Sequence, residues 1–593
     1  MNKRDWVILA TIADLGYKNH RFIADRTDYS IGLVNTSLRK LIDQDYLDKD
    51  YTITNKTKKY MKKSKPQRAV ILAAGTGIRM MPISKTPKCL LEINNEALIE
   101  RIIKQLNEVG VFEIYVVVGY QIEQVEFLSN KFDVELIYDE LFARRDNLHS
   151  LSLASDHLSN AYVVPGNVWF ARNPFSINEY FSWYAISPYL DDESYLRLNR
   201  KMELVYIEDE TPGNSMIGLA YLLDKDAQLV KKELHMLSNK RKYNRETWER
   251  SLFVDNKLLP YARVMLGQSA YKINTYEDLR ELDSYSKDLL SNHINLISQV
   301  FKVPSKEITH ISPLEKGMTN KLMRFSIGDE PYLLRIPGVG SNELTIRQQE
   351  ADVYQALRGK KLTDEIIYIS GQSGYKISKY WENSRTCDAQ SQEDVSMCMK
   401  HLKKLHDMKL EVIHSFNPLK RLDIYENLLT SPPAFADYDV TREKVCELIG
   451  YLDKLPKEEC LCHIDSVTDN FLIFDDQPYL IDWEYAGMCD PPIDIAMFSI
   501  YANYSKEEID QLMHTYYGEE PTELNRFKVY AYAAIGGLLW SVWCEYKNQF
   551  GATFGDYAVK QYRYARDFHK YAMKVLNTQE VIGILRREGR LDA

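Results

Sequence analysis

A histidine, two aspartates and an asparagine in the C-terminal half have residue types and a spacing that could perform chemistry. His463 and Asp465 begin a segment of the form H-x-D-x-x-x-x-N that ends at Asn470, and Asp482 follows twelve residues later, after the apolar residues YLI. Phosphoryl transfer needs one carboxylate to orient the attacking hydroxyl, and an amide with a second carboxylate to hold Mg²⁺ on the phosphates. The spacing therefore predicts Asp465, Asn470 and Asp482 as catalytic residues, with Asn470 and Asp482 as ligands of Mg²⁺.

Residues upstream of this segment could bind the phosphates of a nucleotide, which is ATP in a kinase. A loop that ends at Asn320 would cover the phosphates, with Gly317 and Thr319 inside it. Arg335, in the strand-like segment YLLRIP, stands where a kinase has its phosphate-pairing lysine, and Glu350 in the next helical segment is its expected ion-pair partner. Because arginine and lysine differ in reach and geometry, Arg335 is a departure from an ordinary protein kinase.

Aromatic side chains near the C-terminus could bind the acceptor. Trp540 and Trp543 are three residues apart in a helical segment, so they share one face. Two indoles on a pocket wall suit a quaternary ammonium group, which aromatic faces attract through cation–π interaction. Glu484 and Tyr485 lie just after Asp482 and add a carboxylate and a ring. We predict these four residues as the acceptor site. The alternative, which spacing alone favours, is that both tryptophans belong to the core.

Several separated segments between residues 296 and 575 resemble one known family. They are YLLRIPGVGSNELTIRQQE, GYKISKY, CHIDSVTDNFLIF and YLIDWEYAGMCDPPIDIAMF, and they are similar to bacterial LicA-type choline kinases, in the choline kinase and aminoglycoside phosphotransferase superfamily. The resemblance implies choline as acceptor and phosphocholine as product, with arginine common at the position of Arg335, and the paired tryptophans resemble a choline box. The motifs do not distinguish choline from ethanolamine as the acceptor. Asp490 and Asp494 are expected to brace the catalytic loop.

A glycine-rich segment in the first half of the chain could bind a second phosphate-bearing ligand. The string LAAGTGIRMMP follows the apolar segment AVI directly, and PK follows it. Glycines let the backbone approach phosphate groups, whose charge is met by amide N–H groups and basic side chains. The predicted nucleotide-binding residues are Ala73, Ala74, Gly75, Gly77, Arg79 and Lys88.

This string, with VVVGY and the tail YKINTYEDLRELD, resembles the LicC-type CTP:phosphocholine cytidylyltransferases over about residues 67–285. The resemblance implies CTP as a ligand and acidic metal ligands at two places, but these hold Asn167 and Asn274, and Lys272 replaces a further acidic residue. Asparagine brings no charge and lysine repels a cation. We therefore expect a domain that binds or senses nucleotide or phosphocholine. Alternatives are a bifunctional enzyme making CDP-choline, and a ligand-responsive DNA-binding regulator.

The elements that must position these residues follow from length and pattern. The chain has 593 residues, 45% of them hydrophobic and 27% charged, which fits three or four globular domains. Apolar strand-like segments alternate with helical ones in the middle of the chain, whereas strand-like segments precede helices in the last part. We predict a multidomain α/β and α+β protein: a small winged helix at 1–65, a Rossmann-like nucleotidyltransferase α/β domain at 66–290 and a bilobal protein-kinase-like domain at 296–593.

The first 65 residues differ from the rest in charge. They carry 14 Lys and Arg against 8 Asp, a balance of +6 in a chain of net charge −9. Three helical segments, the third capped by Ser30, precede strand-like residues 51–54, an order that resembles MarR-like winged helix-turn-helix domains. Residues 58–68 are expected to be a linker. The side chains expected to be exposed on the third helix are Asn35, Ser37, Arg39 and Lys40. DNA binding and docking or homodimer formation are equal alternatives.

Cysteine usage and hydropathy bear on the compartment. The eight cysteines are scattered without a C-x-x-C pair, which favours reduced thiols in the cytoplasm. The longest uncharged stretch, residues 529–544, has 16 residues, whereas about 20 apolar residues are needed to span a bilayer. We therefore expect a buried helix there rather than a membrane segment, and no export signal at the N-terminus.

Overall fold

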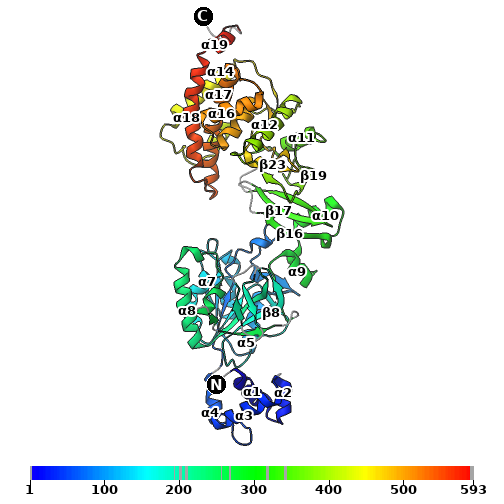
Figure 1. The fold of residues 1–593 in the computed structure, drawn as a ribbon, viewed down its shortest axis with the longest axis vertical. Helices are drawn as coiled ribbons and strands as arrows, with labels where there is room; N and C mark the ends of the chain where they lie inside the picture. Colours follow the sequence, from blue (N-terminus) through cyan, green and yellow to red (C-terminus); the bar gives the residue numbers. More distant parts are fainter. Residues whose placement is uncertain are drawn as a thin grey trace. The chain divides into compact units, whose positions relative to one another are not determined.

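The protein forms two compact units, Met1–Leu296 and Ile297–Ala593, in the computed structural model (Figure 1). Helix α10 (Asn292–Phe301) includes the boundary between them. The residues that the structure describes are 3–27, 29–63, 65–192, 194–199, 204–207, 211–254, 257–258, 260–265, 269–314, 320–338 and 344–587.

The N-terminal part of the first unit is a small helical bundle with its own hydrophobic core. The third helix begins after Ser30, whose hydroxyl accepts a hydrogen bond from the Leu33 N–H. Leu47 and Ile53 pair in a single antiparallel β-bridge, and a fourth helix follows. The helices are α1 (Lys3–Leu15), α2 (His20–Thr27), α3 (Ile31–Asp43) and α4 (Asn55–Lys63).

Three expectations for this bundle were wrong. Helix α4 occupies the first part of the expected linker, and the expected strand is reduced to the bridge at Ile53. On α3, Ser37 is buried and donates a hydrogen bond to Asp5 Oδ1 (2.8 Å), and Lys40 is half-buried, its Nζ 2.6 Å from Asp5 Oδ2. Both side chains contact Asp5 because its carboxylate on α1 is buried and needs hydrogen-bond partners. Arg39 is exposed, as expected.

A seven-stranded sheet forms the centre of the middle domain, in the order β14–β8–β11–β6–β1–β4–β5. The strands β1, β4, β5 and β6 are parallel, as the alternation of strands and helices predicted, but β11 is antiparallel to both its neighbours. Helix α5 covers one face and α7 with α8 the other, so Ile71 and Val70 point into two different cores (Figure 1).

The sheet strands are β1 (Arg68–Leu72), β4 (Glu113–Val118), β5 (Glu135–Tyr138), β6 (Ala161–Pro165), β8 (Trp183–Asp191), β11 (Gly213–Leu222) and β14 (Tyr261–Val264). The helices are α5 (Leu98–Glu108), α7 (Asn147–Leu153), α8 (Asp224–Ser238) and α9 (Tyr276–Leu282). A separate antiparallel pair joins β7 (Val168–Phe170) to β15 (Ala270–Lys272). This pair brings the chain after residue 272 next to the turn after β6.

The second unit begins with a five-stranded antiparallel sheet in the order β16–β17–β18–β20–β19. Its register places Arg335 of β18 directly beside Lys376 of β20. Helix α11 (Arg347–Leu357) follows β18 and buries Glu350 and Val353. The strands are β16 (Ile308–Leu314), β17 (Asn320–Ile327), β18 (Glu330–Pro337), β19 (Ile366–Ile369) and β20 (Lys376–Lys379). The β-rich small lobe was predicted correctly.

The remainder of the second unit is a helical lobe around one large core. Helix α17 (Glu523–Asn548) is buried continuously over residues 527–544, so the expected buried helix is confirmed. In the described part of the chain, no helix has the length and apolar character that crossing a membrane requires. The other elements are α12 (Gln392–Asp407), α13 (Pro418–Leu428), α14 (Tyr438–Leu452), β22 (Cys460–Cys462), β23 (Phe471–Phe474), β24 (Gln477–Leu480), β25 (Gly487–Cys489), α15 (Pro492–Tyr501), α16 (Lys506–Tyr517), α18 (Tyr557–Leu576) and α19 (Gln579–Arg587).

Candidate active site

The segment that contains Asp465 is a loop between β22 and β23, and a buried aspartate on α15 holds it. Asp494 accepts hydrogen bonds from the backbone N–H of His463 (2.8 Å) and of Ile464 (2.6 Å). Ile464 has φ +70°, a left-handed conformation that costs energy in a β-branched residue and persists because these bonds fix it. The expected bracing role of Asp494 is therefore confirmed. Asp490 instead contacts other segments of the lobe.

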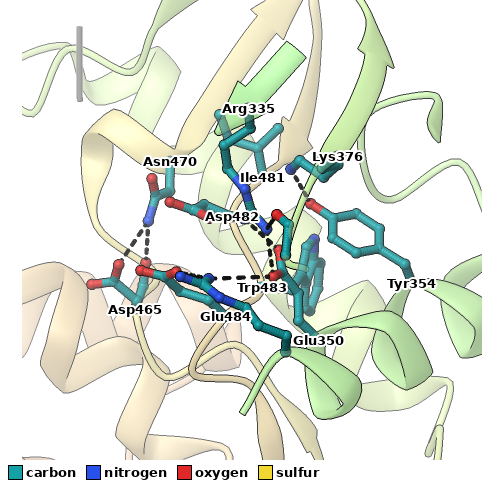
Figure 2. Close-up of polar contacts among 12 residues, drawn as sticks. Arg335, Glu350, Tyr354, Lys376, Asp465, Asn470, Ile481, Asp482, Trp483 and Glu484 are labelled. Atoms are coloured by element: carbon teal, nitrogen blue, oxygen red, sulfur yellow. Dashed lines mark hydrogen bonds and ion pairs between the residues drawn. The ribbon is translucent and has the colours of Figure 1, made fainter. Parts of the chain in front are cut away.

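Two adjoining loops bring Asp465, Asn470 and Asp482 together (Figure 2). The Asn470 amide Nδ2 donates to Asp465 Oδ2 (3.0 Å) and to the Asp465 carbonyl (2.8 Å). The N–H of Ile481 donates to the Asn470 carbonyl (2.9 Å), which fixes the end of β24 beside the catalytic loop. Asp482 follows at once, and its Oδ1 lies 3.1 Å from Arg335 Nη1.

Arg335 is buried in a network of ion pairs. Its Nη1 and Nη2 donate to the two carboxylate oxygens of Glu350 (2.5 and 2.6 Å), and Nη2 also donates to the Gly374 carbonyl (3.1 Å). The expected ion pair with Glu350 is present. A lysine could not make this two-pronged contact while also reaching Asp482, because its single ammonium lacks the planar fork of the guanidinium.

A second buried arginine escaped the sequence analysis. Arg347 Nη1 donates to Glu484 Oε2 (3.0 Å) and lies 3.9 Å from Glu350 Oε2. Arg347 and Glu350 are three residues apart on α11, so their helical spacing could have indicated the contact between these two residues. The spacing gives no indication of the contact with Glu484. The Glu484 carboxylate, predicted to bind the acceptor, is thus already ion-paired.

The carboxylates give the site an excess of negative charge. Desolvation together with the charges of Asp482 and Glu484 raises the pKa of Asp465 to about 8. Desolvation and Asp482 likewise raise the pKa of Glu484 to about 7, against the opposing effect of Arg335. A cation placed among these groups would be attracted, and the Asp482 carboxylate and the Asn470 amide offer the oxygen donors that Mg²⁺ prefers. The donor set fits Mg²⁺.

Trp540 and Trp543 of α17 form an aromatic cluster with Tyr485. The rings of Tyr485 and Trp540 are 5.4 Å apart and those of Trp540 and Trp543 are 5.9 Å apart, both edge to face. The Trp543 N–H and the hydroxyls of Tyr485 and Tyr425 are buried within this cluster and face one another. Tyr485 follows Glu484 directly and stands three residues after Asp482, so the chain joins the cluster to the catalytic segment.

The phosphate-covering loop is described in part. Gly317 and Thr319 lie outside the described residues, whereas Asn320 begins β17 and is buried. Sequence analysis also missed Lys376, whose Nζ donates to the Tyr354 hydroxyl (2.7 Å) beside Arg335 (Figure 2). A lysine within the apolar strand of GYKISKY was the signal that could have indicated a buried cation.

The glycine-rich segment forms a loop at the C-terminal end of β1. Backbone hydrogen bonds join Ala73 and Ala74 to β4 and to the residues just after it. Gly77 has φ +66°, and a Cβ there would lie 3.2 Å from Lys88 Cγ, so glycine lets the lysine stem lie against the loop. The exposed members of the predicted set are Gly75 and Arg79.

Asn167 and Asn274 meet Lys88 at this loop. Asn167 Nδ2 donates to Asn274 Oδ1 (2.9 Å), and Lys88 Nζ donates to the same oxygen (3.2 Å). A Cβ on Gly166 would lie 2.9 Å from the Leu72 carbonyl oxygen, so glycine permits the turn after β6 to approach the loop. The structure therefore brings together the residues at which the chain departs from the cytidylyltransferase pattern.

The fold and the first of these sites define a class of protein. A five-stranded small lobe, a helical large lobe, a braced loop with Asp465 and Asn470, and a buried arginine paired with a helix glutamate are the parts of a protein-kinase-like phosphotransferase.

Comparisons with known proteins place the chain within this class. Residues 311–535 match the choline/ethanolamine kinase family, and residues 69–166 match the MobA-like NTP transferase domain. Protein LicA of Haemophilus influenzae is 32% identical over 258 residues, which cover 41% of this chain and 96% of LicA. The chain belongs to the choline/ethanolamine kinase family.

The middle domain has relatives of its own. The choline-phosphate cytidylyltransferase of Streptococcus pneumoniae is 29% identical over 233 residues, 37% of this chain and 99% of that protein.

Among solved structures, the crystal structure of choline kinase LicA from Streptococcus pneumoniae matches this chain. The match has 27% identity and a TM-score of 0.43, and it covers 47% of this chain and 100% of that one. The family and sequence matches show a choline kinase domain fused to a cytidylyltransferase-like domain.

Proposed function

We propose that the kinase domain, residues 296–593, transfers the γ-phosphoryl group of ATP to the hydroxyl of choline and releases phosphocholine and ADP. A single observation carries this proposal: Tyr485, three residues after Asp482, joins the phosphoryl-transfer segment to a buried aromatic cluster with Trp540 and Trp543. The segment suits transfer to a hydroxyl, and the cluster suits a ligand with a quaternary ammonium.

The residues would divide the reaction as follows. Asp465 orients the choline hydroxyl and accepts its proton as the new P–O bond forms and the bond from the γ-phosphorus to ADP breaks. Arg335, held by Glu350, contacts the ATP phosphates. The residues that would hold Mg²⁺ are Asn470 and Asp482. When bound, Mg²⁺ neutralises charge on the phosphates.

The acceptor is assigned from the chemistry of the aromatic cluster. The rings of Tyr485, Trp540 and Trp543 attract a trimethylammonium group, which cannot donate hydrogen bonds. The primary ammonium of ethanolamine would gain most from a free carboxylate, but the neighbouring carboxylate of Glu484 is paired with Arg347. This pairing favours choline over ethanolamine.

Phosphorus NMR on the purified full chain tests the proposal. With ATP, Mg²⁺ and choline we expect phosphocholine, and Asp465→Asn should slow its formation by at least about a thousandfold. The matched control is Asp469→Asn, which makes the same charge change at an exposed position of the same loop and should keep the activity. Absence of phosphocholine with the unaltered chain would refute the proposal, and faster turnover of ethanolamine would refute choline as the acceptor.

For the middle domain we propose binding of a nucleotide such as CTP, or of phosphocholine, without nucleotidyl transfer. The glycine-rich loop, Arg79 and Lys88 are retained, but Asn167 and Asn274 bring no negative charge for a metal. The alternative is a bifunctional enzyme, and it predicts CDP-choline and pyrophosphate when CTP is added to the same NMR sample. Their appearance would overturn the binding proposal.

For residues 1–65 we propose a winged helix-turn-helix that serves as a docking module. The ring of Trp6 stacks on Tyr180 of the middle domain, with centroids 5.0 Å apart and planes at 8°, and Lys3 lies over the ring of Tyr261. Salt-sensitive binding of DNA fragments would favour the regulator alternative instead. Light scattering of the purified chain tests whether it forms a homodimer.

For the compartment we propose the cytoplasm, because the eight free cysteines suit a reducing environment.

A further inference from the structure

A cluster of cations in the middle domain takes no part in the kinase reaction. Lys88 lies between the glycine-rich loop and Asn274. Lys272 of β15 pairs with Val168, the residue after Asn167, and its Nζ donates to the Met216 carbonyl (3.3 Å). Burial and the positive charges of Arg79 and Lys272 lower the pKa of Lys88 to about 8, with Asp278 as the opposing carboxylate. Like charges at close range repel one another, so an anion bound among them would be stabilised.

The amide pair at the centre of this cluster does not fit a divalent cation. Asn274 Oδ1 already accepts hydrogen bonds from Asn167 Nδ2 and Lys88 Nζ, and both amides are neutral. The nearby carboxylate of Asp278 is engaged as well, because its Oδ2 accepts the N–H groups of Asn274 (2.8 Å) and Thr275 (2.9 Å) in the capping box of α9. Mg²⁺ is usually held in proteins by one or two carboxylates, and here it would also meet the repulsion of three cations.

We propose that this cluster binds the phosphates of a nucleoside triphosphate directly through Arg79, Lys88 and Lys272, without a divalent cation. Backbone N–H groups of the loop at residues 74–77 complete the anion site, since glycines allow the phosphates to approach them. The inference rests on the proposed binding role of the middle domain and specifies its ligand chemistry. It requires that Mg²⁺, which neutralises nucleotide phosphates in solution, weakens binding instead of enabling it.

Titration calorimetry of the full chain with CTP tests this requirement. In EDTA we expect CTP to bind, and in millimolar Mg²⁺ we expect about three- to tenfold weaker binding, because the complexed nucleotide carries less charge. Inorganic pyrophosphate should compete. Binding that appears with Mg²⁺ and is lost in EDTA would overturn the inference.

Variants assign the binding signal to this cluster and not to the kinase domain. Lys88→Gln and Lys272→Gln should each weaken CTP binding in EDTA by about tenfold, the effect of one lost charge-assisted contact. Lys85→Gln, an equal charge change at an exposed position of the same segment, should leave it unchanged. Equal affinity in all three variants would overturn the inference.

A converse variant and a parallel assay complete the test. Asn167→Asp combined with Asn274→Asp supplies two carboxylates, and CTP binding should then be stronger with Mg²⁺ than in EDTA. Unchanged Mg²⁺ dependence in this double variant would count against the site. Choline phosphorylation is measured on the same sample of unaltered chain, so that failure of the kinase proposal and failure of metal-free binding are distinguished.

Discussion

The side chain of Trp540 is the sharpest single-residue probe of the acceptor site. It contributes a ring to the aromatic cluster, and its N–H donates to Met497 Sδ (3.2 Å). Because a desolvated cation–π contact is worth up to about 2 kcal/mol, Trp540→Ala should raise KM for choline by roughly 10- to 30-fold. Steady-state kinetics of Trp540→Ala should show a KM for ATP within about twofold of that of the unaltered chain. Trp540→Phe keeps an aromatic ring and should raise KM for choline less than Trp540→Ala does. Equal increases in both KM values would instead indicate that Trp540 is a core residue.

Lys88 gives the middle domain a predictable pH dependence. With a pKa of about 8 in the free site, Lys88 is charged below pH 8 and becomes neutral above it. A bound anion raises that pKa, so CTP affinity should be constant below pH 8 and fall above it, by up to about tenfold per pH unit. Calorimetry in buffers of different ionisation enthalpy should detect proton uptake near pH 8. Affinity independent of pH between 7 and 9 would contradict this assignment.

The packing of α17 against α18 fixes the helix that carries both tryptophans. A Cβ on Gly537 would lie 2.5 Å from the Gln561 carbonyl oxygen and 2.8 Å from the Ala565 nitrogen, both backbone atoms of α18. Gly537→Ala should therefore destabilise the kinase unit by about 1–3 kcal/mol, as overpacking does. Gly450→Ala is the control, since a Cβ there meets nothing within 4 Å and should stabilise α14 by about 0.5–1 kcal/mol. Thermal unfolding measures both, and similar midpoints would refute this packing argument.

The whole molecule consists of two compact units with separate hydrophobic cores. We expect calorimetry to resolve two unfolding transitions, because each unit can lose its core independently. A ligand stabilises the unit that binds it, so choline with an ATP analogue and Mg²⁺ should raise one midpoint, and CTP in EDTA the other. A single transition that shifts equally with both ligands would contradict this independence.

The sequence was sufficient to predict which residues form the phosphoryl-transfer motif and which helix carries the paired tryptophans, because both motifs are local in the chain. The spacing of Asp465, Asn470 and Asp482 was sufficient to predict a phosphoryl-transfer loop, and helical periodicity placed Trp540 and Trp543 on one face. Strand and helix patterns also predicted both lobes of the kinase domain. These inferences depend on residues close in the chain, where backbone geometry relates spacing to position.

Which charges pair with one another was decided by the tertiary structure alone. The sequence did not indicate that Ser37 and Lys40 turn inward to Asp5, that Arg347 neutralises Glu484, or that Lys88 reaches Asn274, 186 positions away. Buried charges and polar groups must find partners, and the partner is whichever group the packing of distant elements brings within reach. The sequence therefore determined the reaction class and the lost metal ligands, whereas the fold decided which cations remain to bind an anion.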